Sequence, residues 1–116
     1  MALKTKYDLS YDNPIAANTA DFQVSGVVPS GRTVRLLNFG GYEVMVNDGL
    51  TGIIALQWGN GTTWKTVRAG GGGFFDINFL KGKDFLGDGV KQFRLVRQNK
   101  SAVEKILAAW LVALVV

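Results

Sequence analysis

The feature that most constrains the fold is a glycine-centred turn between two strand-like runs in the middle of the chain. Residues 53–58 and 62–67 are rich in β-branched and aromatic residues, and they flank Gly59-Asn60-Gly61. An Asn-Gly pair readily adopts the left-handed backbone angles of a tight hairpin turn, so these runs predict an antiparallel hairpin. The chain has 15 glycines and only 2 prolines, which is typical of many short strands joined by turns. The leading fold class is therefore all-β.

Alternating polar and apolar residues predict further strands along the chain. Residues 3–9 alternate as a half-buried first strand, and residues 21–27 place Phe22 and Val24 on one face that we expect to turn toward the core. Further strands are expected at residues 33–39, 42–47, 74–79 and 90–98. Turn or loop residues separate these segments: Asn13-Pro14, Pro29-Ser30-Gly31, Asn47-Asp48-Gly49, and the polar residues Lys83, Asp84 and Asp88-Gly89.

The number of predicted strands fits a two-layer architecture. About eight short strands in a chain of 116 residues are typical of a two-sheet β-sandwich, and jelly rolls have this strand count. We therefore expect one jelly-roll-like domain over residues 1–116, with residues 1–20 as an N-terminal arm. The length leaves no room for a second hydrophobic core.

The apolar C-terminal segment is compatible with two structures. Ser101-Ala102-Val103-Glu104 fits a capping box that opens a helix, and Ala108, Ala109 and Ala113 are good helix formers. Residues 106–116, however, have no polar face and end in β-branched valines, so we favour a central strand buried on both faces. These 11 apolar residues are fewer than the about 20 that a membrane-spanning helix needs, and no membrane association is expected.

The residue types present exclude most catalytic mechanisms. The chain has no Cys and no His, which removes thiol nucleophiles, the usual zinc sites and histidine-based acid–base catalysis. Its carboxylates fall in turns and on polar strand faces, and no spacing brings two of them together as glycoside hydrolysis requires. The glycine run at residues 70–73 lacks the Lys-Ser or Lys-Thr of a phosphate loop. It is better explained as a flexible or tightly apposed segment whose bare backbone passes close to another chain. We expect no enzyme activity, cofactor or metal.

Positive charge is concentrated in the second half of the chain. Residues 1–58 carry four basic and five acidic side chains, whereas residues 59–116 carry nine and four. A basic stripe is expected from Lys91, Arg94, Arg97, Lys100 and Lys105. Such a stripe suits an acidic protein surface, and the alternative is a solvated face without a partner. Without interleaved aromatic residues the stripe does not favour nucleic acid.

The tryptophans on either side of the hairpin turn also allow two interpretations. Trp58 and Trp64 face each other across the turn, where such a pair commonly packs into the core. Exposed, they could instead stack on sugar rings, with Tyr42 as a third contact. Core packing is favoured.

The chain resembles the small cement or decoration proteins of tailed bacteriophage heads. The resemblance is carried by the late strand Lys91-Gln92-Phe93-Arg94-Leu95-Val96-Arg97, the turn Gln98-Asn99-Lys100-Ser101 and the apolar C-terminal stretch. It implies a jelly-roll-like structural protein of the virion that binds between major capsid protein subunits and strengthens the shell. It also implies synthesis in the host cytoplasm and a location on the capsid surface. The start of the chain, which lacks an apolar secretory stretch, agrees with cytoplasmic synthesis.

The expected contacts lie in two places. Leu3, Tyr7 and Tyr11 would contact neighbours from the N-terminal arm, and Arg94, Arg97 and Lys100 from the basic stripe. An apolar C-terminus and a mean hydropathy of +0.14 favour a homo-oligomer or other virion subunits as partners. The alternative function is a carbohydrate-binding module or tail-fibre domain that uses Trp58, Trp64 and Tyr42.

Overall fold

The computed structural model describes residues 7–44, 51–71 and 73–116, and these residues form nine β-strands and no helix. The predicted all-β class is confirmed. The strands are β1 (Leu9–Tyr11), β2 (Pro14–Ile15), β3 (Thr19–Val24), β4 (Thr33–Glu43), β5 (Gly52–Gly59), β6 (Trp64–Gly71), β7 (Phe75–Leu86), β8 (Gln92–Asn99) and β9 (Lys105–Val115).

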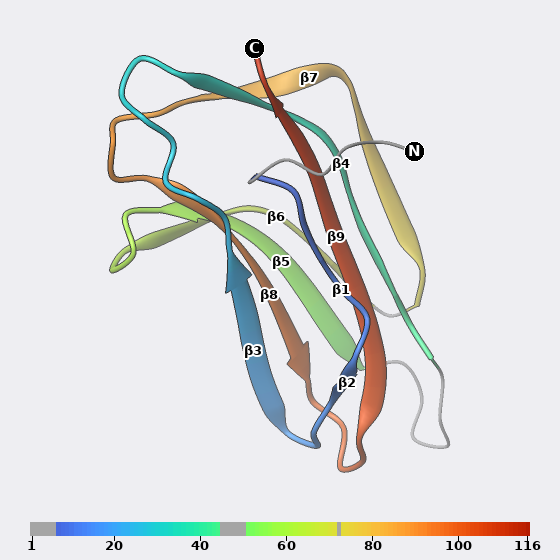
Figure 1. Ribbon diagram of the computed structural model, residues 1–116. Helices are drawn as coiled ribbons and strands as arrows, with labels where there is room; N and C mark the ends of the chain where they lie inside the picture. Colours follow the sequence, from blue (N-terminus) through green and yellow to red (C-terminus); the bar gives the residue numbers. More distant parts are fainter. Residues whose placement is uncertain (1–6, 45–50, 72) are drawn as a thin grey trace.

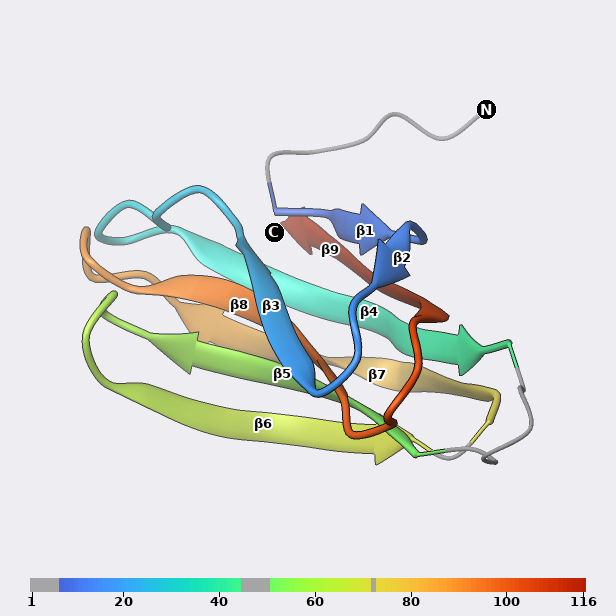
Figure 2. The same ribbon diagram turned by 90° about the horizontal axis from the view of Figure 1, so that it is seen from below.

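The strands form two antiparallel sheets that pack as layers (Figures 1 and 2). One sheet has the order β1-β9-β4-β7, with β2 also paired to β9, and the other has the order β3-β8-β5-β6. Because β1 and β2 both pair with β9, they are two halves of one interrupted strand. The chain thus fills eight strand positions and alternates between the sheets as a jelly roll does, which confirms the predicted two-sheet sandwich.

The central hairpin is confirmed in detail. Strands β5 and β6 pair antiparallel from Gly59↔Trp64 to Ile53↔Gly71. The Asn60 carboxamide oxygen accepts hydrogen bonds from the main-chain N–H groups of Thr62 and Thr63, and Gly61 has a φ of +94°. Glycine takes this left-handed conformation without steric cost, so the Asn-Gly pair closes the turn.

The C-terminal segment is strand β9, as favoured, and it lies in the interior of its sheet between β1 and β4. Leu107, Ala109, Leu111 and Ala113 turn inward and are buried. The expected burial on both faces is wrong, because Ile106, Val112 and Leu114 turn outward and are more than a third exposed. A two-layer sandwich covers the inner face of each sheet and leaves the outer face to solvent or to a partner. Within the described residues, no helix is long and apolar enough to cross a membrane.

The start of the chain differs from the expected arm. Residues 3–6 of the predicted first strand, including Leu3, lie outside the described residues, as does the predicted turn Asn47-Asp48-Gly49. Tyr7 is buried in the core, and β1 and β2 extend the sheet rather than project from it. The described part of the predicted arm is therefore part of the sandwich.

Two further predictions need correction. Phe22 and Val24 do not face the core, and they are 58% and 44% exposed on the outer face of β3. The register of β3 instead turns Asp21 inward, where it pairs with the buried Arg97. The polar loop expected at Lys83 and Asp84 belongs to the long strand β7, where Asp84 pairs with Arg35 of β4.

Candidate functional site

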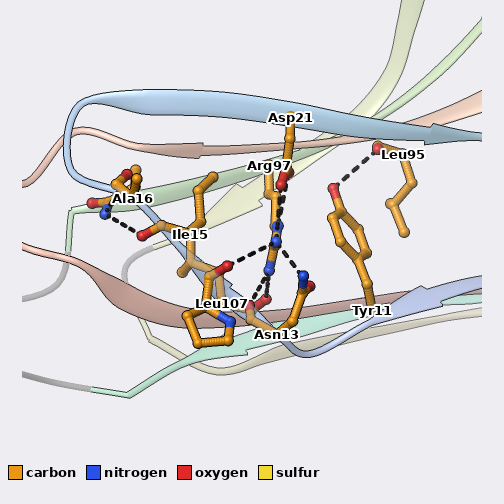
Figure 3. A network of polar contacts seen from close by, with 10 residues as sticks. Tyr11, Asn13, Ile15, Ala16, Asp21, Leu95, Arg97 and Leu107 are labelled. Atoms are coloured by element: carbon orange, nitrogen blue, oxygen red, sulfur yellow. Dashed lines mark hydrogen bonds and ion pairs between the residues drawn. The ribbon is translucent and has the colours of Figure 1, made fainter.

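An internal polar cluster joins the two sheets at one end of the sandwich (Figure 3). Arg97 of β8 is fully buried, and its Nε and Nη2 donate to the two carboxylate oxygens of Asp21 at 2.8 and 2.9 Å. Its Nη1 donates to the main-chain oxygens of Asn13 and Leu107 at 2.5 and 2.7 Å, and Nη2 also donates to Asn13 Oδ1. We call Arg97, Asp21, Asn13 and these carbonyl groups the Arg97 network. It ties β8 and β3 of one sheet to the β1–β2 interruption and β9 of the other.

Tyr11 is part of the same cluster rather than an exposed contact. Its ring lies 4.1 Å from the Arg97 guanidinium carbon, and its hydroxyl donates to the main-chain oxygen of Leu95 at 3.1 Å. Burial, together with the negative charge of Asp21, raises the pKa of the Tyr11 phenol well above its usual value. Among the described residues, no buried side-chain nitrogen or oxygen lacks a hydrogen-bond partner, so the cluster joins the two sheets through satisfied contacts.

The predicted basic stripe is not a single surface. Successive residues of a strand point to opposite faces, so Arg97 lies with the inward residues Phe93 and Leu95, while Arg94 lies on the outer face. Lys105 is also buried, and its ammonium group donates to Glu43 Oε2 at 2.6 Å. Lys91 and Lys100 are exposed in the segments that flank β8. Among the predicted protein contacts, Arg94 and Lys100 remain accessible.

The outer face of the β3-β8-β5-β6 sheet carries an arginine between two aromatic rings. The Arg94 guanidinium carbon lies 4.3 Å from the centre of the Trp64 ring and 5.2 Å from that of Phe22. Its Nε donates to Gln57 Oε1 at 2.7 Å. These contacts hold the arginine flat on the sheet, because a planar guanidinium stacks well on aromatic faces. We call Phe22, Val24, Gln57, Trp64 and Arg94 the basic face.

The β3-β8-β5-β6 sheet carries more basic than acidic side chains. Its four strands, which the structure describes throughout, contain a single acidic residue, Asp21, and that carboxylate turns inward to Arg97. Lys65 and Arg68 are exposed on the edge strand β6, but their register partners are the inward-facing Trp58 and Leu56, so they do not belong to the basic face. The positive charge of Arg94 is therefore not neutralised by a carboxylate of these four strands.

The outer face of the opposite sheet contains a hollow with aromatic walls. A cavity of about 290 Å³ is lined by Ser10, Tyr11, Asp12, Tyr42, Ala108, Ala109 and Trp110. It forms because Ala108 of β9, a small residue, pairs with Tyr42 of β4, so the methyl group forms a floor below larger neighbours. Ser10 and Asp12 lie on the opposite rim, at the end of β1. We call this cavity with Ser10, Asp12, Tyr42, Ala108 and Trp110 the aromatic hollow.

The position of the Trp110 ring beside the hollow is fixed by contacts on β4. A Cβ atom at Gly40 would lie 2.4 Å from the Trp110 ring, so the indole rests directly on the glycine backbone of β4. Its Nε1 donates to Asn38 Oδ1 at 2.5 Å, and the Asn38 amide nitrogen donates to Asp76 and Asn78 on β7. These contacts fix the position of the ring. Phe74 stands next to it with ring centroids 6.4 Å apart and is 72% exposed.

The three aromatic residues of the predicted sugar site are not brought together. Trp58 packs against Phe85 and Phe93 with ring centroids 5.1 and 4.6 Å apart, so the favoured core role describes it. Trp64 lies on the basic face, whereas Tyr42 lies on the outer face of the other sheet. Among the residues that the structure describes, no three acidic side chains gather closely enough to hold a metal ion.

Sequence reasoning missed Trp110 and Phe74 as surface residues. The unbroken apolar character of residues 106–116 indicates burial on both sides, whereas the period of two in a strand groups one set of side chains on a single face: Ile106, Ala108, Trp110, Val112 and Leu114. A tryptophan within that face was the available signal.

Comparison with known proteins supports the fold. No protein-family model matches the chain, and no curated protein matches it. Its fold is similar to the crystal structure of PirA, with a TM-score of 0.50 over 95% of this chain and 97% of that chain, at 18% sequence identity. At this identity the likeness shows a shared sandwich architecture, and it carries no function across.

Proposed function

We propose that this protein is a structural binding protein that attaches through its basic face to a larger protein assembly, the capsid shell of a tailed bacteriophage. The observation that supports docking is the composition of the basic face: exposed Phe22 and Val24 adjoin Arg94, and no carboxylate of those strands points outward. The shell as partner comes from the resemblance to decoration proteins.

Docking of this kind needs no reactive group. Apolar side chains such as Phe22 lose contact with water when a partner covers them, which favours association. Arg94 then selects a partner whose facing surface is acidic, because a like-charged surface would be repelled. Several copies bound around a symmetric shell would add their contacts, so that individually modest interfaces stabilise the whole.

Cosedimentation with capsids that lack the protein tests this proposal. The unaltered protein should sediment with the shells and raise their rupture temperature. The substitutions Arg94→Glu and Phe22→Ser should each weaken sedimentation by about tenfold or more, because they reverse the charge or remove the exposed ring. Arg32→Glu, which makes the same charge change at an exposed turn outside the face, is the matched control and should bind normally.

Two results would contradict the proposal. A protein that stays in the supernatant with intact shells does not decorate them. The second result is that the unaltered protein binds a fluorescent single-stranded oligonucleotide and Arg94→Glu abolishes this binding. That result would assign the basic face to nucleic acid, since arginine beside aromatic rings can also stack on bases.

A further inference from the structure

We propose that the aromatic hollow on the opposite sheet binds a neutral saccharide built of hexose units. This site lies on the other side of the sandwich from the basic face and does not depend on the proposed docking. The proposal rests on the shape of the hollow, the fixed position of its aromatic walls and the kind of polar groups on its rim.

The shape suits a ring-sized ligand. The cavity of about 290 Å³ lies near the lower end of the range found for small-molecule sites, roughly 300–1,000 Å³. The Ala108 methyl group forms its floor, and Trp110 and Tyr42 stand beside it. A pyranose ring has one face of C–H groups, and such a face packs well against an indole or phenol ring.

The aromatic walls are preorganised. Gly40 beneath the indole and Asn38 at its Nε1 hold Trp110 in place before any ligand arrives. An aromatic ring that is already positioned loses little conformational entropy on binding, so more of the contact energy contributes to affinity.

The rim supplies hydrogen-bonding groups for hydroxyls. Among the described residues, none forms a hydrogen bond with the Asp12 carboxylate or the Tyr42 hydroxyl. A carboxylate accepts from two hydroxyls at once, and a phenol both donates and accepts. Asp12 on the rim and Asp76 next to Asn38 make this face unfavourable for acidic sugars, so the structure favours neutral hexoses.

Binding to a printed array of neutral and acidic glycans, followed by affinity electrophoresis in gels that contain the matching neutral polysaccharide, tests the site. The unaltered protein should bind neutral hexose glycans on the array and be slowed in the gel. Tyr42→Ala and Asp12→Asn should each weaken binding by about tenfold, a loss typical of one aromatic or charged contact. Trp64→Ala, which removes an aromatic ring from the opposite sheet, is the matched control and should bind as before.

Folding of each variant is checked by circular dichroism, and Trp110→Phe provides a milder change of the same wall. The proposal is overturned if the array shows no binding to neutral glycans, if acidic glycans bind best, or if Tyr42→Ala and Trp110→Phe both bind with unchanged affinity. Because Arg94→Glu should leave glycan binding intact, failure of the docking proposal and failure of this one give different results.

Discussion

Replacing Arg97 with methionine should destabilise the protein strongly, because methionine fills a similar volume but donates no hydrogen bonds. The change leaves the buried Leu107 carbonyl, the Asn13 carbonyl and the Asp21 carboxylate without their donor. Removing one partner of a buried ion pair costs about 3–5 kcal/mol, and each buried carbonyl without a partner adds about 1–3 kcal/mol. The Asp21 side chain is 42% exposed and can regain water, which reduces its share. We therefore expect a loss of about 4 kcal/mol.

That loss is large for a domain of this size. A chain of 116 residues is stable by roughly 6–17 kcal/mol, so the variant would keep a folded state but unfold at a midpoint about 15 °C lower. Urea unfolding followed by far-ultraviolet circular dichroism measures the change at constant temperature. Arg68→Met on the exposed edge strand β6 makes the same chemical change where no buried acceptor is lost, and its midpoint should not move.

A double-mutant cycle distinguishes the network from simple packing. Asp21→Leu in the natural background leaves the Arg97 guanidinium without its counter-charge and should destabilise the protein. In the Arg97→Met background the same substitution should have little effect, because no buried charge remains. If Arg97→Met costs less than about 1 kcal/mol, or if the two substitutions are additive, the Arg97 network does not hold the sheets together in the way described.

Three further predictions concern the interior. Glu43→Gln removes the counter-charge of the buried Lys105 ammonium and should cost about 3 kcal/mol in urea unfolding. The pKa of Tyr11 is raised in the folded protein, so the unfolded chain releases the phenolic proton at a lower pH than the folded protein does. The contribution of Tyr11 to stability is therefore intact below pH 10 and falls as the pH rises further. Unfolding measured between pH 8 and 11.5 should show a smaller loss of stability at alkaline pH in Tyr11→Phe. Gly41→Ala places a Cβ atom 2.3 Å from the Ile54 side chain and 2.6 Å from the Ala108 oxygen. The substitution should therefore lower the free energy of unfolding, measured by thermal unfolding, by about 1–3 kcal/mol. An unchanged stability would show that the sheets can move apart at this position.

Local patterns predicted the features that depend on neighbouring residues. The β5–β6 hairpin follows from Asn60-Gly61, whose conformational preferences act within four residues. The β-branched valines of β9 and the absence of a polar face favour a strand over a helix. The two-layer architecture follows from the number of strands, since short alternating strands must bury one face against another sheet.

Features that depend on distant residues could not be read in this way. The sequence predicts that Phe22 and Val24 face inward because apolar residues usually turn to the core, but Arg97 pairs with Asp21 on the inner side of β3 instead. Arg97, which needs Asp21 as its counter-charge, lies 76 residues away from it in the sequence. Similarly, Asn13 and Arg97 are 84 residues apart, and nothing near either residue indicates their contact. A buried arginine reverses the usual face of a neighbouring strand because an unpaired internal charge costs more than an exposed phenylalanine.

The separation between interior and outer faces makes the two binding proposals testable on a stable protein. The structure is held by the core between the sheets, by the buried ion pair Lys105–Glu43, and by the pair of buried Arg97 with the partly exposed Asp21. Phe22, Arg94, Tyr42 and Asp12 belong to outer faces and contribute little to either. Substitutions at these outer positions should therefore change binding without changing the unfolding midpoint. Because the two faces belong to different sheets on opposite sides of the sandwich, a ligand bound at either proposed site would leave the other site accessible.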